Sequence, residues 1–122
     1  MLIPLKKIIN TTPHALTMRC GETGSVYSLP PCGTVLSAKP AEQSAGTHLL
    51  GAELVRVSFE PDEVALSILA RLETEHPGSI IVGSIISAQA FPGRVFALVP
   101  VAGYERVPPE QKQMRDDKFT TY

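Results

Sequence analysis

Residues 61–91 read PDEVALSILARLETEHPGSIIVGSIISAQAF and carry the strongest structural signals in the chain. The first half predicts a helix that begins at Pro61-Asp62-Glu63, where acidic residues suit the positive end of the helix dipole. Apolar residues at i, i+4 and i+8 spacing give this helix one broad apolar side, formed by Val64, Ala65, Ile68, Leu69 and Leu72. His76-Pro77-Gly78 ends it, because proline disfavours helical geometry in the preceding residue. We expect this helix to lie across a sheet.

The second half, residues 79–91, is the most apolar stretch of the chain. Its isoleucines and valine favour a central strand buried on both faces. A short helix from Ser84 onward is the alternative interpretation. Beyond this stretch, Phe91-Pro92-Gly93-Arg94 predicts a turn, and residues 95–101 predict a partner strand.

Towards the N-terminus, turn residues recur about every ten positions, a spacing typical of short antiparallel strands. Residues 2–9 predict a strand that Pro4 confines to a sheet edge, since proline cannot donate to a ladder. Residues 15–20 alternate cleanly, and the glycines within 21–24 predict a hairpin into 25–29. A further short strand is expected around 34–37.

Residues 38–47 are small, polar and rich in turn formers, which predicts a mobile surface loop. A hairpin is expected around Gly51-Ala52, with arms over 48–50 and 53–60. The fold predicted from these elements is α+β, a mainly antiparallel sheet of about six strands with one principal helix packed on it. Residues 1–122 should form a single domain, in which 108–122 is a candidate C-terminal docking extension.

Composition excludes several functional classes. The 122 residues carry 11 Lys plus Arg against 12 Asp plus Glu, a balance that argues against binding to duplex nucleic acid. No apolar run reaches membrane-spanning length and the first ten residues do not resemble a signal peptide, so we expect a cytoplasmic protein without a membrane partner. The three histidines are scattered, the two cysteines are too few for a disulfide scaffold, and common nucleotide and metal motifs are missing. We therefore expect no metal, no cofactor and no catalytic residues.

Arginines near aromatic residues are the best candidates for ligand binding. Arg56 interrupts an apolar strand, Arg94 lies in a turn near Phe91, and Arg106 follows Tyr104 by two residues. A guanidinium group can bind phosphate through two hydrogen bonds, and an aromatic ring can stack on a base. These five residues predict a site for a small nucleotide-like anion, although each arginine could instead pair with a nearby glutamate or face water.

Three segments carry a family resemblance: INTTPHAL at 9–16, LPPCGT at 29–34, and residues 80–100 with their Pro92-Gly93-Arg94 turn. They resemble a family of small phage and prophage proteins with an "NxTPH" opening. Chain length, β-rich layout and opening are also similar to the phage Thoeris anti-defence sponges, which bind cyclic ADP-ribose signals without cleaving them and assemble as oligomers. The resemblance implies a pocket shared between protomers, with an arginine on the diphosphate and an aromatic ring on the adenine.

The function expected from both arguments is a non-catalytic homo-oligomer that sequesters a nucleotide-derived anionic signal, of the cyclic ADP-ribose or cyclic oligonucleotide type, and so counteracts host immune signalling. Two alternatives remain open. One is a small hydrolase or lyase acting on such a ligand. The other is a non-enzymatic assembly subunit that would dock through the 38–47 loop and the tail over 110–122.

Overall fold

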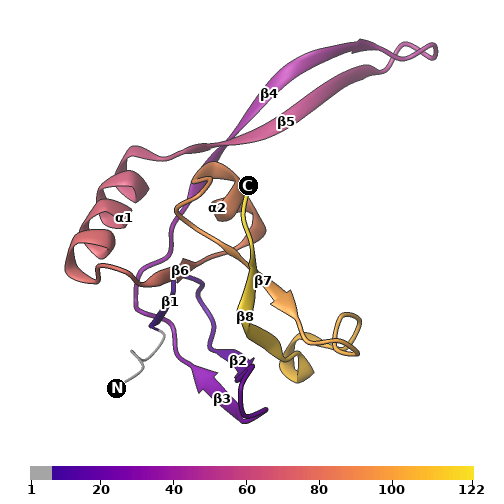
Figure 1. The fold of residues 1–122 in the computed structure, drawn as a ribbon. Helices are drawn as coiled ribbons and strands as arrows, with labels where there is room; N and C mark the ends of the chain where they lie inside the picture. Colours follow the sequence, from indigo (N-terminus) through magenta and orange to yellow (C-terminus); the bar gives the residue numbers. More distant parts are fainter. Residues whose placement is uncertain (1–6) are drawn as a thin grey trace.

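The computed structural model describes residues 7–122, which form eight strands, two α-helices and one short 3-10 helix (Figure 1). The strands fall into three small sheets. The smallest joins β1 (Ile8–Asn10) to β6 (Ile80–Val82) in parallel, and Val82 also bridges to Phe96. This sheet therefore links the start of the described chain to its middle.

The largest sheet has four strands in the order β3-β2-β8-β7. β2 (Leu16–Arg19) pairs antiparallel with β3 (Val26–Leu29) and parallel with β8 (Met114–Thr120). β7 (Ala97–Pro100) runs antiparallel to β8, and the 3-10 helix η1 (Pro109–Gln111) lies between them in the chain. The segment predicted as a docking extension thus supplies an inner strand of this sheet.

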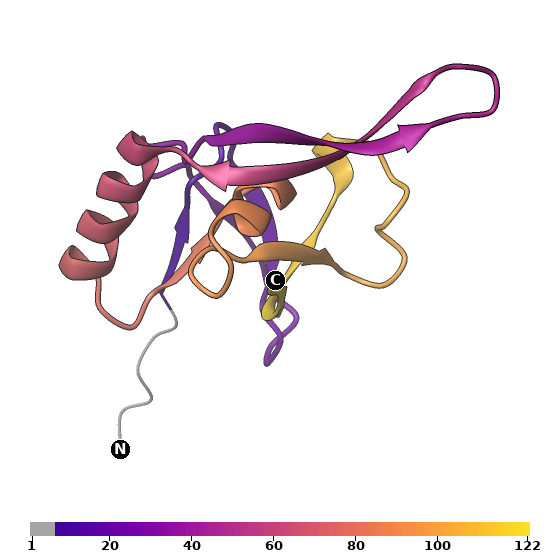
Figure 2. The ribbon, with the colours of Figure 1, turned by 90° about the horizontal axis from the view of Figure 1, so that it is seen from above.

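The third sheet is a long hairpin that extends away from the rest of the molecule in both views (Figures 1 and 2). Its strands are β4 (Ala38–Thr47) and β5 (Glu53–Pro61), with a register shift between Ser44 and Gly46. We call this hairpin, residues 38–61, the arm. Its base packs on the body: Ala38 and Phe59 contact the core, and α2 lies against β5 and β4.

Both helices begin at a side-chain cap. The Asp62 carboxylate accepts a hydrogen bond from the backbone N–H of Val64 at the start of α1 (Glu63–Glu75). Ser84 caps α2 (Ile85–Ala90) by accepting from the backbone N–H of Ser87. Neither helix, within the part of the chain that is described, is long and apolar enough to cross a membrane.

The core lies between α1, the β1–β6 pair and α2. Its members are buried apolar side chains from these elements and the segments beside them: Ile9, Leu36, Ala65, Leu69, Leu72, Ile81, Ala88, Ala90, Phe91, Val95 and Ala97. Gly83 lies where β6 passes into α2, and a Cβ there would approach Val95 Cγ1 at 2.9 Å and Thr11 Oγ1 at 3.1 Å. This junction is packed too closely for a larger residue.

Asn10 and Thr11 form a buried polar junction beside that core. Asn10 Nδ2 donates to the carbonyl oxygens of His14 (2.8 Å) and Leu29 (3.1 Å), and Asn10 Oδ1 accepts from the backbone N–H and hydroxyl of Thr12. The Thr11 hydroxyl donates to the carbonyl of Val82 at 2.7 Å. The NTTPH segment thus joins the end of β1 to β6, to the start of β2 and to the end of β3.

The α+β class, the principal helix and the hairpin at 21–24 are confirmed. A hairpin also turns near 51–52, but its first arm is β4, and the predicted arm over 48–50 is wrong because those residues lie in the turn. The single six-stranded, mainly antiparallel sheet is wrong, because the eight strands form three small sheets of mixed direction. The parallel pairings β1–β6 and β2–β8 join segments far apart in sequence, and no local turn signals them.

Three local predictions are also wrong. Residues 38–47 form β4 and not a loop, because β5 supplies a partner for its backbone. Residues 34–37 pair with no strand, and Leu36 instead packs into the core. Val64 lies on the exposed side of α1, whereas Ala65, Leu69 and Leu72 are buried as expected.

In residues 79–91, the alternative with a short helix is confirmed: a three-residue strand, β6, is followed by α2. The Ser84 cap explains the change from strand to helix. Pro4 and the strand predicted over 2–6 lie outside the described residues, while Ile8 and Ile9 do belong to a strand, β1.

The polar junction predicts that Asn10→Asp lowers the free energy of unfolding by about 2 kcal/mol or more, because a carboxylate would face the carbonyls of His14 and Leu29 where an amide now donates. Urea denaturation measures the change. Gln111→Glu, the same amide-to-acid change at an exposed position, is the control and should cost little. Equal effects of the two changes would contradict a structural role for Asn10.

Candidate functional site

Strands β2 and β8 place two arginines side by side. Arg19 and Arg115 are register partners in the parallel pairing, so they lie on one face of the sheet, on strands about 4.8 Å apart. Like charges on neighbouring positions of a sheet are unfavourable. A nearby negative charge is therefore expected to stabilise this arrangement.

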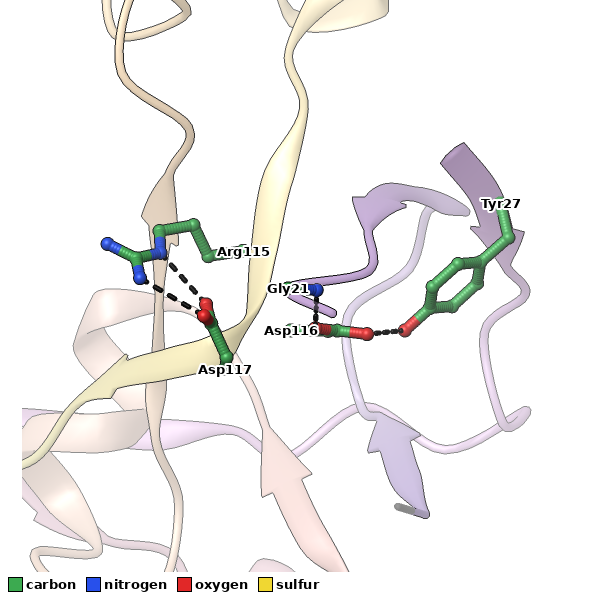
Figure 3. Close-up of polar contacts among 5 residues, drawn as sticks. All are labelled: Gly21, Tyr27, Arg115, Asp116 and Asp117. Carbon is green, nitrogen blue, oxygen red and sulfur yellow. Dashed lines mark hydrogen bonds and ion pairs between the residues drawn. The ribbon is translucent and has the colours of Figure 1, made fainter. Parts of the chain in front are cut away.

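Asp117 provides that charge for Arg115. Arg115 Nε donates to Asp117 Oδ1 at 2.9 Å and Nη2 donates to Oδ2 at 3.1 Å, as Figure 3 shows. The two residues are two positions apart on β8 and so share a face. The hydrogen bonds that Arg115 donates to Asp117 raise the pKa of the Arg115 guanidinium, which remains charged.

Arg19 has a different environment. Its guanidinium carbon lies 5.3 Å from the centroid of the Tyr104 ring, within the range of a cation–π contact. Its Nε is buried and has no hydrogen-bond partner within residues 7–122. The Arg19 side chain is half-buried and lines the hollow described next.

A hollow of about 310 Å3 adjoins these side chains. It is lined by Arg19, Cys20, Gly21, Gly24, Val101, Ala102, Arg115 and Asp117, and we call it the arginine pocket. The lining carries two guanidinium groups against one carboxylate. A second carboxylate, that of Asp116, lies directly beside the lining, where it accepts from the backbone N–H of Gly21.

The turn after β2 is fastened to β8 beside this pocket. The backbone N–H of Gly21 donates to Asp116 Oδ1 at 2.9 Å, and the Tyr27 hydroxyl donates to Asp116 Oδ2 at 2.9 Å (Figure 3). A Cβ at position 21 would lie 2.6 Å from Asp117 Cγ, so glycine allows the turn to approach β8 closely. These contacts fix one wall of the arginine pocket.

Cys20 contributes a thiol to the pocket lining. Hydrogen bonds from the Thr23 side chain and from the backbone of Thr23 and Glu22 lower its pKa, the Thr23 side chain having the largest effect. Both cysteines are free, and Cys32 is exposed. No group of three or more His, Cys, Asp or Glu side chains in the described range is arranged to hold a metal ion.

The five ligand-binding residues predicted from sequence lie in different parts of the fold. Tyr104 lies beside the arginine pocket through its contact with Arg19, whereas Phe91 is buried in the core and has no free ring face. Arg56 lies on the exposed arm, and Arg106 is exposed in the segment after β7. The structure does not bring these residues together into one site.

Arg94 belongs to a second hollow, of about 340 Å3, beside β6. This hollow is lined by Glu73, His76, Gly78, Ser79, Ile81, Gly93, Arg94 and Phe96. Arg94 Nε donates to Glu73 Oε2 at 3.2 Å and Nη2 bonds Oε1, and these hydrogen bonds raise the pKa of Arg94. The cation here is already neutralised, so we regard the arginine pocket as the stronger candidate.

Arg19 and Arg115 were not among the residues nominated from sequence. Arg19 lies on a predicted strand, and its alternation with Met18 shows that it faces away from the core. Arg115 lies 96 positions later, in the segment predicted as a C-terminal docking extension. Only the parallel β2–β8 pairing brings them together, and no spacing in the sequence signals it.

No family model, no curated protein and no solved structure matches this chain. The evidence for the site therefore rests on its own geometry.

The Tyr27–Asp116 contact predicts a pH dependence of stability. Burial raises the pKa of Tyr27 to about 12, and the hydrogen bond to Asp116 adds to the effect. Because the folded-state pKa exceeds the ordinary value of 10.0, the neutral phenol stabilises the fold fully below that pH, and its contribution is lost as the pH rises towards about 12. Urea denaturation should show that Tyr27→Phe loses less stability than the wild type over this interval.

Tyr122→Phe, at an exposed tyrosine near the C-terminal end, is the control and should follow the wild type. Tyrosinate absorbance gives a second measurement, since Tyr27→Phe should remove the ionisation near pH 12. If the two variants titrate alike, Tyr27 is not the group with the raised pKa.

Proposed function

We propose that the protein is a non-catalytic binding protein that captures a small nucleotide-derived anion in the arginine pocket. The observation that carries the proposal is the pair of register partners Arg19 and Arg115, which both line the arginine pocket, with Arg19 Nε unpartnered within residues 7–122. A phosphate or diphosphate supplies several strong acceptor oxygens to such groups. Binding would also relieve the repulsion between the two cations.

Tyr104 gives the pocket a second kind of contact. Its ring already holds the Arg19 guanidinium, and an aromatic ring beside an arginine is a common platform for a nucleobase. Phosphate next to base is the chemistry of cyclic ADP-ribose and cyclic oligonucleotides. This class of ligand agrees with the resemblance to sponge proteins, which act by counteracting host immune signalling.

The chemistry of the lining favours binding over turnover. Asp117 is engaged by Arg115, Cys20 has the Thr23 hydroxyl as its side-chain neighbour, and no histidine belongs to the described lining. A nucleophile activated by an adjacent base is the usual signature of covalent catalysis. We therefore propose a protein that holds its ligand and releases it unchanged.

The size of the pocket bears on assembly. At about 310 Å3 it lies at the lower end of the range for small-molecule sites, which begins near 300 Å3. One protomer can therefore enclose a compact ligand or part of a larger one. We propose that the protein works as a homo-oligomer, in which a second protomer would complete the enclosure.

The proposal predicts that cyclic ADP-ribose or a cyclic dinucleotide raises the Tm, because a ligand that binds only the folded state stabilises it. Arg19→Gln should weaken binding about tenfold or more, since it removes a charged donor from the pocket. Asp117→Asn should have the opposite effect, because it removes the carboxylate that competes with the ligand for Arg115. Isothermal titration calorimetry measures the affinities, and circular dichroism checks that each variant is folded.

Arg106→Gln is the matched control, an exposed arginine outside the pocket lining, and should bind as the wild type does. Equal losses in the Arg19 and Arg106 variants, or no binding of either ligand class, would contradict the proposal. Ligand recovered after heat denaturation separates binding from catalysis: intact ligand supports the proposal, and a converted product would show an enzyme.

A further inference from the structure

Beyond its base, the arm extends away from the rest of the described chain (Figures 1 and 2). Each of its strands spans about 30 Å, and neither outer edge pairs with another strand in residues 7–122. Two-stranded hairpins are only marginally stable in water when nothing packs on them. Because only the base of the arm contacts the core, its outer part requires another source of stability.

The outer part of the arm is also unusually apolar for an exposed surface. Leu49 and Leu50 at the tip are 99% and 89% exposed, and Val57 on β5 is 50% exposed. Leu54 and Val55 are exposed on the same strand. Val55 and Val57 share one face of β5 and Leu54 lies on the other, so both faces expose apolar side chains. Exposed apolar surface of this kind is a mark of an interaction surface.

The solvent-accessible surface of the chain is larger than that of a compact monomer of the same mass. A compact monomer of 13.1 kDa exposes about 6,400 Å2, whereas this chain exposes 8224 Å2. A standard protein interface buries about 800 Å2 of each partner.

The two edges of the arm differ in their ability to accept another strand. β4 contains Pro40, which has no amide hydrogen, and also carries the register shift between Ser44 and Gly46. Proline and bulges are the features by which edge strands avoid further pairing. β5 has neither feature between Glu53 and Glu60, so its free edge can add a strand.

The sequence of β5 is complementary to itself. When two copies run antiparallel about a two-fold axis at Ser58, Arg56 lies opposite the partner's Glu60, and Val57 lies opposite the partner's Phe59. Symmetry repeats each pairing. Cross-strand pairs of opposite charge and of apolar with aromatic residues are the combinations that stabilise sheets.

We propose that the arm is a docking surface for a second copy of this chain, joined through the free β5 edges in the register centred on Ser58. In this register residues 55–61 of the two β5 strands pair, which gives the arm a four-stranded sheet near its base and places Val57 in the interface. Leu49 and Leu50 at the tip lie beyond the paired residues. The dimer specifies the oligomer expected under the proposed function. Its test needs no ligand, so its failure and that of the arginine pocket are distinguishable.

Sedimentation velocity over a concentration series tests the proposal. The wild type should sediment as a dimer, with twice the 13.1 kDa mass of the chain. Val57→Lys should weaken the dimer about tenfold or more, because it places an unpaired charge in the interface. Val64→Lys is the matched control, since Val64 is exposed on α1 and lies outside the arm, and should not change the dissociation constant.

The register is tested by mixing two charge variants. Arg56→Glu and Glu60→Arg should each dimerise weakly alone, since each places like charges opposite one another, while an equimolar mixture should dimerise about fivefold more tightly than either. Circular dichroism confirms that all variants are folded. A wild type that stays monomeric at tens of micromolar would overturn the proposal and assign the arm to a different partner.

Equal dissociation constants for the Val57→Lys and Val64→Lys dimers would also overturn it. So would a mixture of the two charge variants whose dimer is no tighter than the dimer of either variant alone.

Discussion

The fold depends on a buried polar junction at Asn10 and Thr11. Four chain segments meet there: the end of β1, the start of β2, the end of β3, and β6, whose Val82 carbonyl accepts from the Thr11 hydroxyl. The Asn10 amide uses both of its donors and accepts two hydrogen bonds through its oxygen, so the cost of burying it is offset. Because β2 starts at this junction, the junction also sets the position of Arg19 at the other end of that strand. The stability of the fold and the geometry of the arginine pocket are therefore coupled through one short strand.

Helix caps and turns can be predicted from the sequence of this protein, whereas the pairing of strands far apart in the chain cannot. Asp62 and the apolar spacing after it predict α1 correctly, and the glycines near 21–24 predict the β2–β3 hairpin, since caps and turns act over a few residues. The parallel pairings of β1 with β6 and of β2 with β8 leave no local trace, and this is why one large antiparallel sheet was expected in place of three small ones. Residues 38–47 have weak strand propensity, and the register with β5 overrides it.

The lack of any local sequence signal for long-range contacts also explains the errors in the predicted ligand site. Tyr104 was nominated, and it does lie against an arginine, but that arginine is Arg19 and not Arg106. Phe91 was chosen for its ring, yet its position after a capped helix places that ring in the core. Arg94 was chosen for its turn, and Glu73 from the last turns of α1 neutralises it. Whether an arginine can bind a ligand depends on the groups that contact its guanidinium in the folded chain. Those contacts are set by the tertiary structure and cannot be read from the sequence. The proposed function accordingly rests on Arg19 and Arg115, and the proposed dimer on the exposed β5 edge.

The most direct test of the arginine pocket is a two-dimensional amide NMR titration of the wild-type protein with cyclic ADP-ribose and, separately, with a cyclic dinucleotide. Gly21, Gly24 and Ala102 line the pocket, and Gly78 and Gly93 line the second hollow, so their backbone signals report on each place separately. The account predicts saturable shifts at the first three residues and little change at the other two. Shifts confined to Gly78 and Gly93, or no saturable shift at Gly21, Gly24 and Ala102, would contradict it.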